Sequence, residues 1–115
     1  ALRQVLLEAL PLNRRQHSSW RIWLALWYHS ESSEAMRKEE RRRYREWLGR
    51  ISAILRESID LGELSAGTDV DARARLLVAM VDGLGVQFLM AGGRMSARKL
   101  TALVDSALDE LFGTG

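Results

Sequence analysis

The segment that most constrains the fold of this chain is residues 72–91, which has the length of a helix and is apolar on nearly every side. From Leu76 to Ala91 the only ionisable side chain is Asp82. A helix on the surface of a small domain buries one apolar stripe and leaves a polar face to water. Asp82, Gln87 and two glycines also make the segment a poor membrane span. We therefore expect it to pack against its own domain on one side and against a second subunit on the other.

The composition is typical of one soluble globular domain. A chain of 115 residues with 47% hydrophobic and 28% charged residues supports a single core. The formal charge of +2 permits many partners and indicates none. The absence of cysteine excludes disulfides and thiol catalysis, and no signal peptide is visible, so we expect a cytoplasmic protein without a membrane partner.

Apolar residues recur at helical spacing in five segments, and no stretch alternates with a period of two over a useful length. The pattern predicts an all-α fold. The five predicted helices cover residues of about 1–10, 13–31, 34–61, 69–91 and 96–112.

Short signals mark the ends of these helices. Gly62 stands where a left-handed stop is expected, and the glycine pair at 92–93 ends the fourth helix. Thr68 with Asp71 resembles a capping box that opens the fourth helix, and Ser96 is placed to cap the fifth.

The second predicted helix carries an aromatic stripe that suits a pocket for a mostly apolar small molecule. The stripe consists of Trp20, Trp23, Trp27 and Tyr28. Such side chains combine large apolar faces with polar N–H and O–H tips. Tyr44 and Trp47 on the third helix are placed to complete a cavity wall. The alternative is that the stripe is ordinary core, as apolar stripes at helical spacing usually are.

The charged run at residues 37–46 has two interpretations. Clustered bases suggest nucleic-acid binding, but acidic residues interrupt the run and pair with bases four positions away. These i, i+4 pairs are Glu34–Lys38, Glu39–Arg43 and Arg42–Glu46. The pattern favours a solvated helix face over a DNA contact.

Gly83 and Gly85 lie inside the apolar segment, where each costs about 1 kcal/mol relative to alanine. Because Ala79 extends this ridge of small residues, we expect a tight helix crossing here, within the chain or between subunits. Gly83-Leu84-Gly85 is no dinucleotide-binding motif, since no strand precedes it and a third glycine is missing. Asp82 needs a hydrogen-bonding or cationic partner, or a place at the edge of the interface.

No motif indicates catalysis or a metal site. His17 and His29 are the only histidines, and neither has the spacing of a metal ligand. The chain has no Gly-x-Ser-x-Gly elbow and no phosphate-binding glycine loop. We predict no cofactor, no metal and no enzymatic activity, although a catalytic pair of carboxylates needs no motif.

Several short motifs follow one another through the whole chain. They are Leu7-Glu8-Ala9-Leu10-Pro11-Leu12, Trp20-x-x-Trp23-Leu24-Ala25-Leu26-Trp27, Tyr44-Arg45-x-Trp47, Gly62-x-Leu64, Asp69-Val70-Asp71 and Val81-Asp82-Gly83-Leu84. Their order and spacing resemble the C-terminal domain of TetR-family transcriptional regulators, in the BetI-like or AcrR-like subgroup. The best single marker is the Asp82-Gly83-Leu84 step within an apolar penultimate helix.

The resemblance implies a homodimer in which the last two helices of each subunit form a four-helix bundle. By position, the interface is expected to contain Leu77, Val81, Leu84, Gly85, Phe88, Leu100, Val104, Leu108 and Leu111. The resemblance also implies an effector pocket among the helices before the bundle. Its expected lining is Trp20, Trp23, Trp27, Tyr28, Trp47, Ile51 and Met80.

The family's helix-turn-helix has no counterpart in these residues, so residues 1–115 are expected to form the effector-binding and dimerisation domain alone. DNA binding is then expected of a segment upstream of Ala1. The resemblance implies a repressor that releases DNA when a small, largely apolar molecule binds. Two alternatives stay open, a ligand-free helical oligomerisation module and, less favoured, a small helical enzyme. A cavity lined by the tryptophans would favour the effector-binding domain over the ligand-free module.

Overall fold

The computed structural model describes residues 2–29, 33–91 and 94–113, and every regular element within those ranges is an α-helix. The helices are α1 (Leu2–Glu8), α2 (Arg14–His29), α3 (Glu34–Asp60), α4 (Val70–Met90) and α5 (Ala97–Leu111). The all-α prediction is confirmed, and each predicted end lies within about two residues of the observed one. The predicted stop at the 92–93 glycine pair lies outside the described residues.

Side-chain caps set the starts of α4 and α5. Ser96 accepts a hydrogen bond from the Lys99 amide at the start of α5, as predicted. The cap of α4 is Asp69, whose carboxylate accepts from the Ala72 amide, instead of the predicted Thr68. The Thr68 amide instead donates to the Ser65 carbonyl in the preceding turn, so the helix begins one position later.

The end of α3 is a left-handed stop, as the sequence predicts. Gly62 has φ of +79°, and the amides of Gly62, Glu63 and Leu64 donate to carbonyl groups in the last turn of α3. This stop reverses the chain and brings α4 back along α3.

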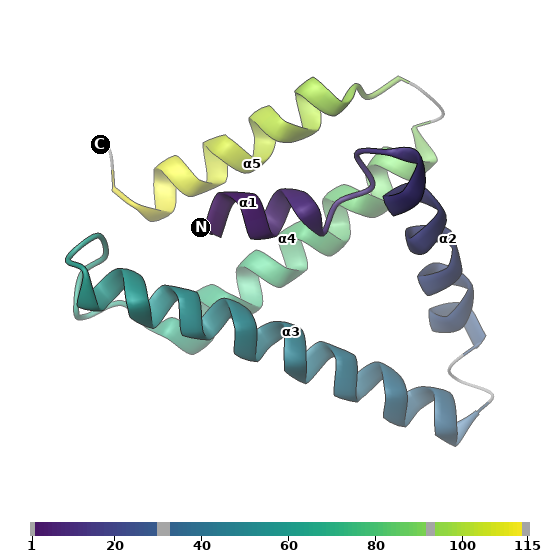
Figure 1. Cartoon of the computed structure of the whole chain (residues 1–115), viewed down its shortest axis with the longest axis horizontal. Coiled ribbons are helices and arrows are strands. Elements are labelled where there is room, and N and C mark those ends of the chain that lie inside the picture. The colour runs from purple at the N-terminus through teal and green to yellow at the C-terminus, as the bar shows by residue number, and fades with distance from the viewer. Residues whose placement is uncertain (1, 30–32, 92–93, 114–115) are drawn as a thin grey trace.

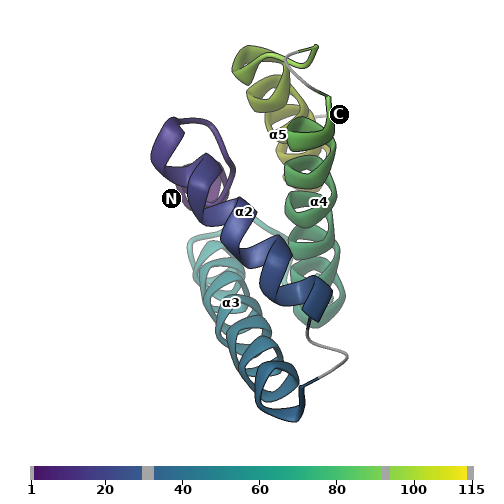
Figure 2. The ribbon, with the colours of Figure 1, turned by 90° about the vertical axis from the view of Figure 1, so that its right-hand side faces the viewer.

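The five helices form a thin, two-layered assembly. Its Cα atoms span 43 × 35 × 18 Å, and the shortest dimension is close to two helix diameters. Seen along the slab, α4 and α5 lie on one side, α1 and α3 on the other, and α2 crosses at one end (Figure 2). The main packing partners are α3 with α4, α1 with α5 and α3, and α2 with α3. A slab of this thickness leaves every helix with a side near the surface.

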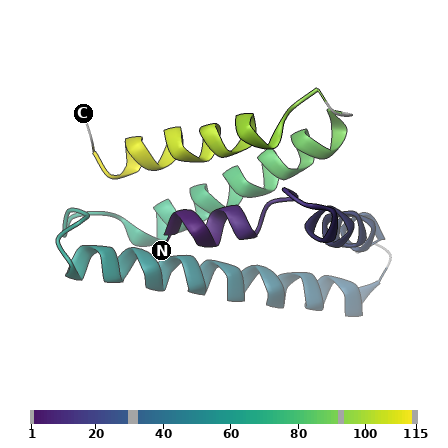
Figure 3. The ribbon, with the colours of Figure 1, turned by 45° about the horizontal axis from the view of Figure 1, so that its top comes forward.

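The short helix α1 occupies the centre of the slab, between α3 and α5 (Figure 3). Leu6 and Leu10 are fully buried there, as is Pro11 directly after the helix. Leu6 and Leu10 belong to one apolar cluster with buried residues from all four longer helices, namely Trp20, Ile51, Leu55, Ala74, Leu77, Val78, Val81, Leu100, Val104 and Leu108. One apolar core therefore connects the two layers, and α1 completes it.

Six of the nine residues expected at the subunit interface are buried within a single chain. They are Leu77, Val81, Gly85, Leu100, Val104 and Leu108. Leu84, Phe88 and Leu111 are partly buried and pack against the same core. Helices α1, α2 and α3 already cover the faces on which these six residues lie within the chain, and their place at a subunit interface stays a prediction.

The opposite face of α4 is exposed and carries little charge. Leu76 is 61% exposed and Met90 is 79% exposed, and Ala79 and Gly83 between them are exposed too. These residues are three, four and seven positions apart, so they lie on one side of the helix. We call Leu76, Ala79, Gly83 and Met90 the outer face of α4. One side of the apolar helix α4 is thus covered by other helices of this chain, and the opposite side is exposed.

Candidate functional site

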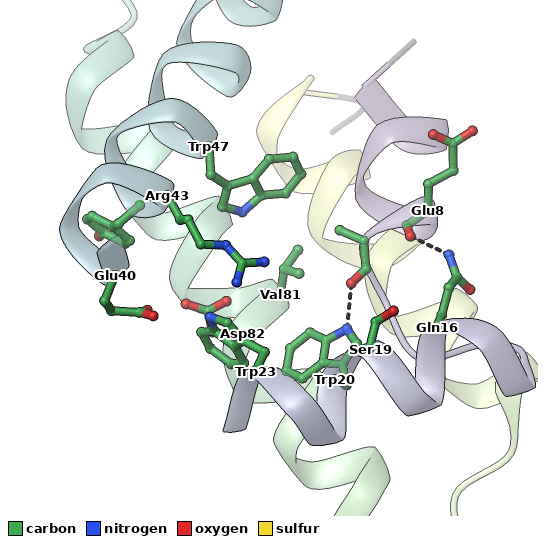
Figure 4. A pocket seen from close by; sticks show the side chains of 12 residues that line it. Glu8, Gln16, Ser19, Trp20, Trp23, Glu40, Arg43, Trp47, Val81 and Asp82 are labelled. Carbon is green, nitrogen blue, oxygen red and sulfur yellow. Dashed lines mark hydrogen bonds between the residues drawn. The ribbon is translucent and has the colours of Figure 1, made fainter. Parts of the chain in front are cut away.

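A cavity of about 390 Å³ lies where α2, α3, α4 and the end of α1 meet (Figure 4). Its walls come from segments far apart in the sequence. The lining residues are Glu8, Ala9, Gln16, Ser19, Trp20, Trp23, Glu40, Arg43, Tyr44, Trp47, Val81 and Asp82. A mostly apolar cavity of this size with a few polar groups is typical of a small-molecule site.

Three tryptophans form the aromatic part of the wall. Trp20 and Trp23 meet edge to face, with ring centroids 5.2 Å apart and ring planes at 76°. Trp47 lines the cavity from α3, across from these two rings (Figure 4). The aromatic wall therefore joins two helices, and the lining of α2 comes from the first half of its stripe.

Trp20 is held in place by two features of its surroundings. Its indole N–H donates to the Ala9 carbonyl oxygen over 2.7 Å, which fixes the corner between α1 and α2. Its ring also covers Gly85 so closely that a Cβ atom at that position would overlap the indole. The tight approach predicted at Gly85 is therefore to an aromatic side chain, whereas nothing lies within 4 Å of the same point at Gly83.

Asp82 lies in the same cavity and is half-buried. Two causes together raise its pKa to about 6: burial, which removes water from the ionised carboxylate, and the nearby negative charge of Glu40. Among the described residues, Asp82 forms no ion pair. The described part of the chain therefore shows no cationic partner of the kind expected for it from the sequence.

Three of the seven residues expected in the pocket line the observed cavity, namely Trp20, Trp23 and Trp47. Ile51 lies one turn beyond Trp47 and is fully buried in the core. Met80 packs against the core without lining the cavity, and Tyr28 is 82% exposed near the end of α2. The side chain of Trp27 lies outside the described part of the structure.

The polar lining was missed in the sequence, apart from the singling out of Asp82. Glu8, Gln16, Ser19, Glu40 and Arg43 come from three helices and carry no local signal, because each has the spacing of an ordinary surface residue. Their shared position depends on how the helices cross. Gln16 bridges two of those helices through a hydrogen bond from its amide to the Glu8 carbonyl oxygen.

The charged first half of α3 is an ion-paired surface, as predicted. Glu34 pairs with Arg37 and Arg41, at 2.7 and 3.3 Å, in place of the expected Lys38. Arg42 pairs with Glu39 at 2.5 Å, in place of the expected Glu39–Arg43 pair, and with Glu46 at 2.6 Å, as expected. These partners neutralise part of the basic run at the surface, which favours a solvated helix face.

Two searches over the described residues bear on other kinds of site. No group of three or more His, Cys, Asp or Glu side chains in those ranges is arranged to hold a metal ion. No helix in the described part combines the length and apolarity needed to cross a membrane.

Comparison with protein families gives a match over almost the entire chain. Residues 1–113 match the family described as BetI-type transcriptional repressor, C-terminal. Comparison with curated proteins and with solved structures gave no match. The resemblance inferred from the motifs is thereby confirmed, together with a role in transcriptional regulation. The chain belongs to the BetI-type, TetR-family repressors and corresponds to their C-terminal domain.

Proposed function

We propose that this chain is the effector-binding and dimerisation domain of a cytoplasmic TetR-family repressor, which releases DNA when a small, largely apolar molecule binds. The observation that carries the proposal is the 390 Å³ cavity lined by Trp20, Trp23 and Trp47. An open cavity of this size with aromatic walls suits a small-molecule ligand, whereas a ligand-free oligomerisation module has no use for one. The family match adds the regulatory role.

In this proposal, the outer face of α4 is covered by a second copy of the chain. Large exposed apolar side chains flank a stretch of small ones there, so a second helix backbone can approach closely. Ala102 and Ser106 of α5 are also small and exposed, which extends the same kind of surface onto the last helix. The subunit bundle thus uses the outward sides of α4 and α5, and not the six residues buried inside each chain.

DNA binding is assigned in this proposal to a helix-turn-helix segment outside residues 1–115. A dimer that reads two half-sites depends on the distance between its two reading segments. A ligand changes this distance only if it binds the DNA-bound and released conformations with different affinity. The pocket is well placed for such coupling, because its walls join the α1–α2 corner to α4.

The first experiment follows tryptophan emission while apolar and amphiphilic molecules are added. Ligand binding is expected to quench or shift the emission, because three indoles line the cavity. Replacing Trp47 with Leu should remove part of that change. Emission that a broad set of molecules leaves unaltered would favour the ligand-free module.

The second experiment tests the dimer by sedimentation. Leu76→Glu places a charge on the outer face of α4 and is expected to give a folded monomer. Leu61→Glu is the matched control, because Leu61 is 66% exposed at the end of α3, away from the proposed interface. An unchanged dimer for Leu76→Glu, or equal dissociation of both variants, would contradict the assignment.

A further inference from the structure

The cavity is lined by more acidic than basic side chains. Glu8, Glu40 and Asp82 contribute three carboxyl groups, and Arg43 contributes one guanidinium. The Glu8 carboxylate accepts a hydrogen bond from the Gln4 amide at 3.2 Å. The lining thus has an excess of negative charge, and none of its three carboxyl groups forms an ion pair within the described residues.

The surroundings of Asp82 disfavour its ionised form when no ligand is bound. It is half-buried, and its pKa is raised because burial removes water and Glu40 adds a second negative charge. A ligand that brings a positive charge and N–H donors would reverse both effects. Hydrogen bonds between ionised donors and acceptors are about twice as strong as those between neutral groups.

The aromatic wall favours the same charge. The faces of indole rings carry negative potential and attract cations, with tryptophan the strongest of the aromatic side chains. Trp23 and Trp47 line the cavity together with Asp82. The cavity therefore combines an apolar aromatic surface with an acidic end.

We propose that the cavity takes a protonated amine with an apolar body, whose N–H groups bind the carboxylates of Asp82 and Glu40. This inference rests on the proposed function, since it specifies which molecule the effector pocket accepts. The apolar body lies against Trp20, Trp23 and Trp47, which supply most of the contact area. The ammonium group lies between α3 and α4, where the two carboxylates stand.

Arg43 is the chain's own competitor for the ligand cation. Its side chain points into the cavity in Figure 4, and among the described residues it forms no ion pair. A guanidinium on a flexible, exposed side chain can move out to solvent when an amine enters. Removing its positive charge is therefore expected to strengthen the binding of an amine.

The proposal has a pH dependence with a definite sign. The charged or titratable groups that line the cavity around Asp82 are Glu40, Arg43 and Tyr44 on α3 and Glu8 on α1, and α2 contributes none. An amine binds the ionised form of Asp82, whose pKa is about 6. Its affinity should therefore rise from about pH 5 to about pH 7.5, while that of a neutral analogue stays nearly constant.

The test compares four probes by isothermal titration calorimetry on the 115-residue chain. They are 4-phenylbutylamine, its neutral analogue 4-phenylbutan-1-ol, its N,N,N-trimethyl derivative and the anion 5-phenylpentanoate. The amine is expected to bind about tenfold more tightly than the alcohol, because one charge-assisted hydrogen bond has this effect. The trimethyl derivative, which has no N–H donor, should bind more weakly than the amine, and the anion most weakly.

Matched variants assign the effect to residues. Asp82→Asn should lower the affinity for the amine about tenfold and leave that for the alcohol unchanged. Glu40→Gln should act in the same direction with a smaller loss, and Glu57→Gln, exposed on α3 outside the cavity, is its control. Arg43→Gln should raise the affinity for the amine, whereas Arg45→Gln should not.

The outcomes separate this inference from the function on which it rests. If the alcohol or the anion binds as tightly as the amine, the inference is overturned and the effector pocket stands. If the trimethyl derivative equals the amine, the hydrogen bonds to the carboxylates are refuted. If neither the amine nor the alcohol binds, the inference fails, and the broader screen of tryptophan emission then decides the proposed function. Circular dichroism of each variant excludes loss of folding as the cause.

Discussion

The two faces of α4 have similar apolar character in the sequence and opposite environments in the structure. On the inner face, Val78 and Val81 are fully buried against the chain's own core. On the outer face, Leu76 and Met90 are mostly exposed. Hydropathy alone does not distinguish the two, because both lack charge. The difference arises because a slab 18 Å thick has helices to cover only one side of α4.

The inner face packs within the single chain and stabilises its fold, whereas the outer face is exposed and, in our proposal, is covered by a second copy of the chain. Substitutions on the inner face should therefore change the free energy of unfolding of a single chain. Substitutions on the outer face should change association and leave that free energy nearly unaltered. The following predictions test this division, and they run from the largest expected effect to the smallest.

Val81→Asp is expected to abolish stable folding, because it places an unpaired charge in the core. The expected loss is about 4 kcal/mol or more, measured by urea unfolding. Ala79→Asp introduces the same carboxylate two positions away on the outer face and should leave a folded chain that associates less strongly. Comparable unfolding by both substitutions would show that the two faces are not different.

Gly85→Ala should lower the free energy of unfolding by about 1–3 kcal/mol, because the added methyl group would overlap the Trp20 ring. Gly83→Ala adds the same methyl group where nothing lies within 4 Å and should raise that free energy by up to about 1 kcal/mol. Thermal unfolding at a concentration that keeps the chain monomeric measures both. Equal effects of the two substitutions would contradict the placement of Trp20 over Gly85.

Asp82→Asn tests the boundary between the faces, where the cavity opens. The pKa of Asp82 is raised from 3.8 to about 6, so the folded state binds protons more tightly than the unfolded state. Stability is therefore lost as the pH rises from about 4 through about 6. After allowance for solvent screening of a half-exposed group, the loss is about 1 kcal/mol. The variant should be more stable than the parent chain at pH 7 and nearly equal to it near pH 4, as measured by thermal unfolding.

The sequence predicted the helices well because their signals are local. Apolar spacing, Ser96 and Gly62 act within a few residues of where they stand, and each has the predicted role. The sequence did not reveal which side of α4 is buried within the chain, because a uniformly apolar helix gives no signal for which side its own chain covers. Only the crossing of α1, α2 and α3 over α4 decides that Val81 is inside and Leu76 outside.

The candidate site was predictable in part for a similar reason. Large aromatic residues at helical spacing indicated the apolar wall, and Trp20, Trp23 and Trp47 do meet there. All four aromatic residues of the stripe were expected to line the pocket, but the last turns of α2 extend beyond the cavity, and Tyr28 is exposed to solvent. Glu40 and Arg43 escaped notice because a charged residue on a long surface helix is ordinary until another helix crosses it.

Because the Trp20 ring packs directly on Gly85, the side-chain sizes that fit at positions 20 and 85 depend on each other. A bulkier residue at one of them demands a slimmer one at the other, so Gly85→Ala and Trp20→Leu should each be less harmful in the presence of the other. Since the Trp20 N–H also anchors the Ala9 carbonyl, such a compensated pair would restore the fit but leave the α1–α2 corner without its tether.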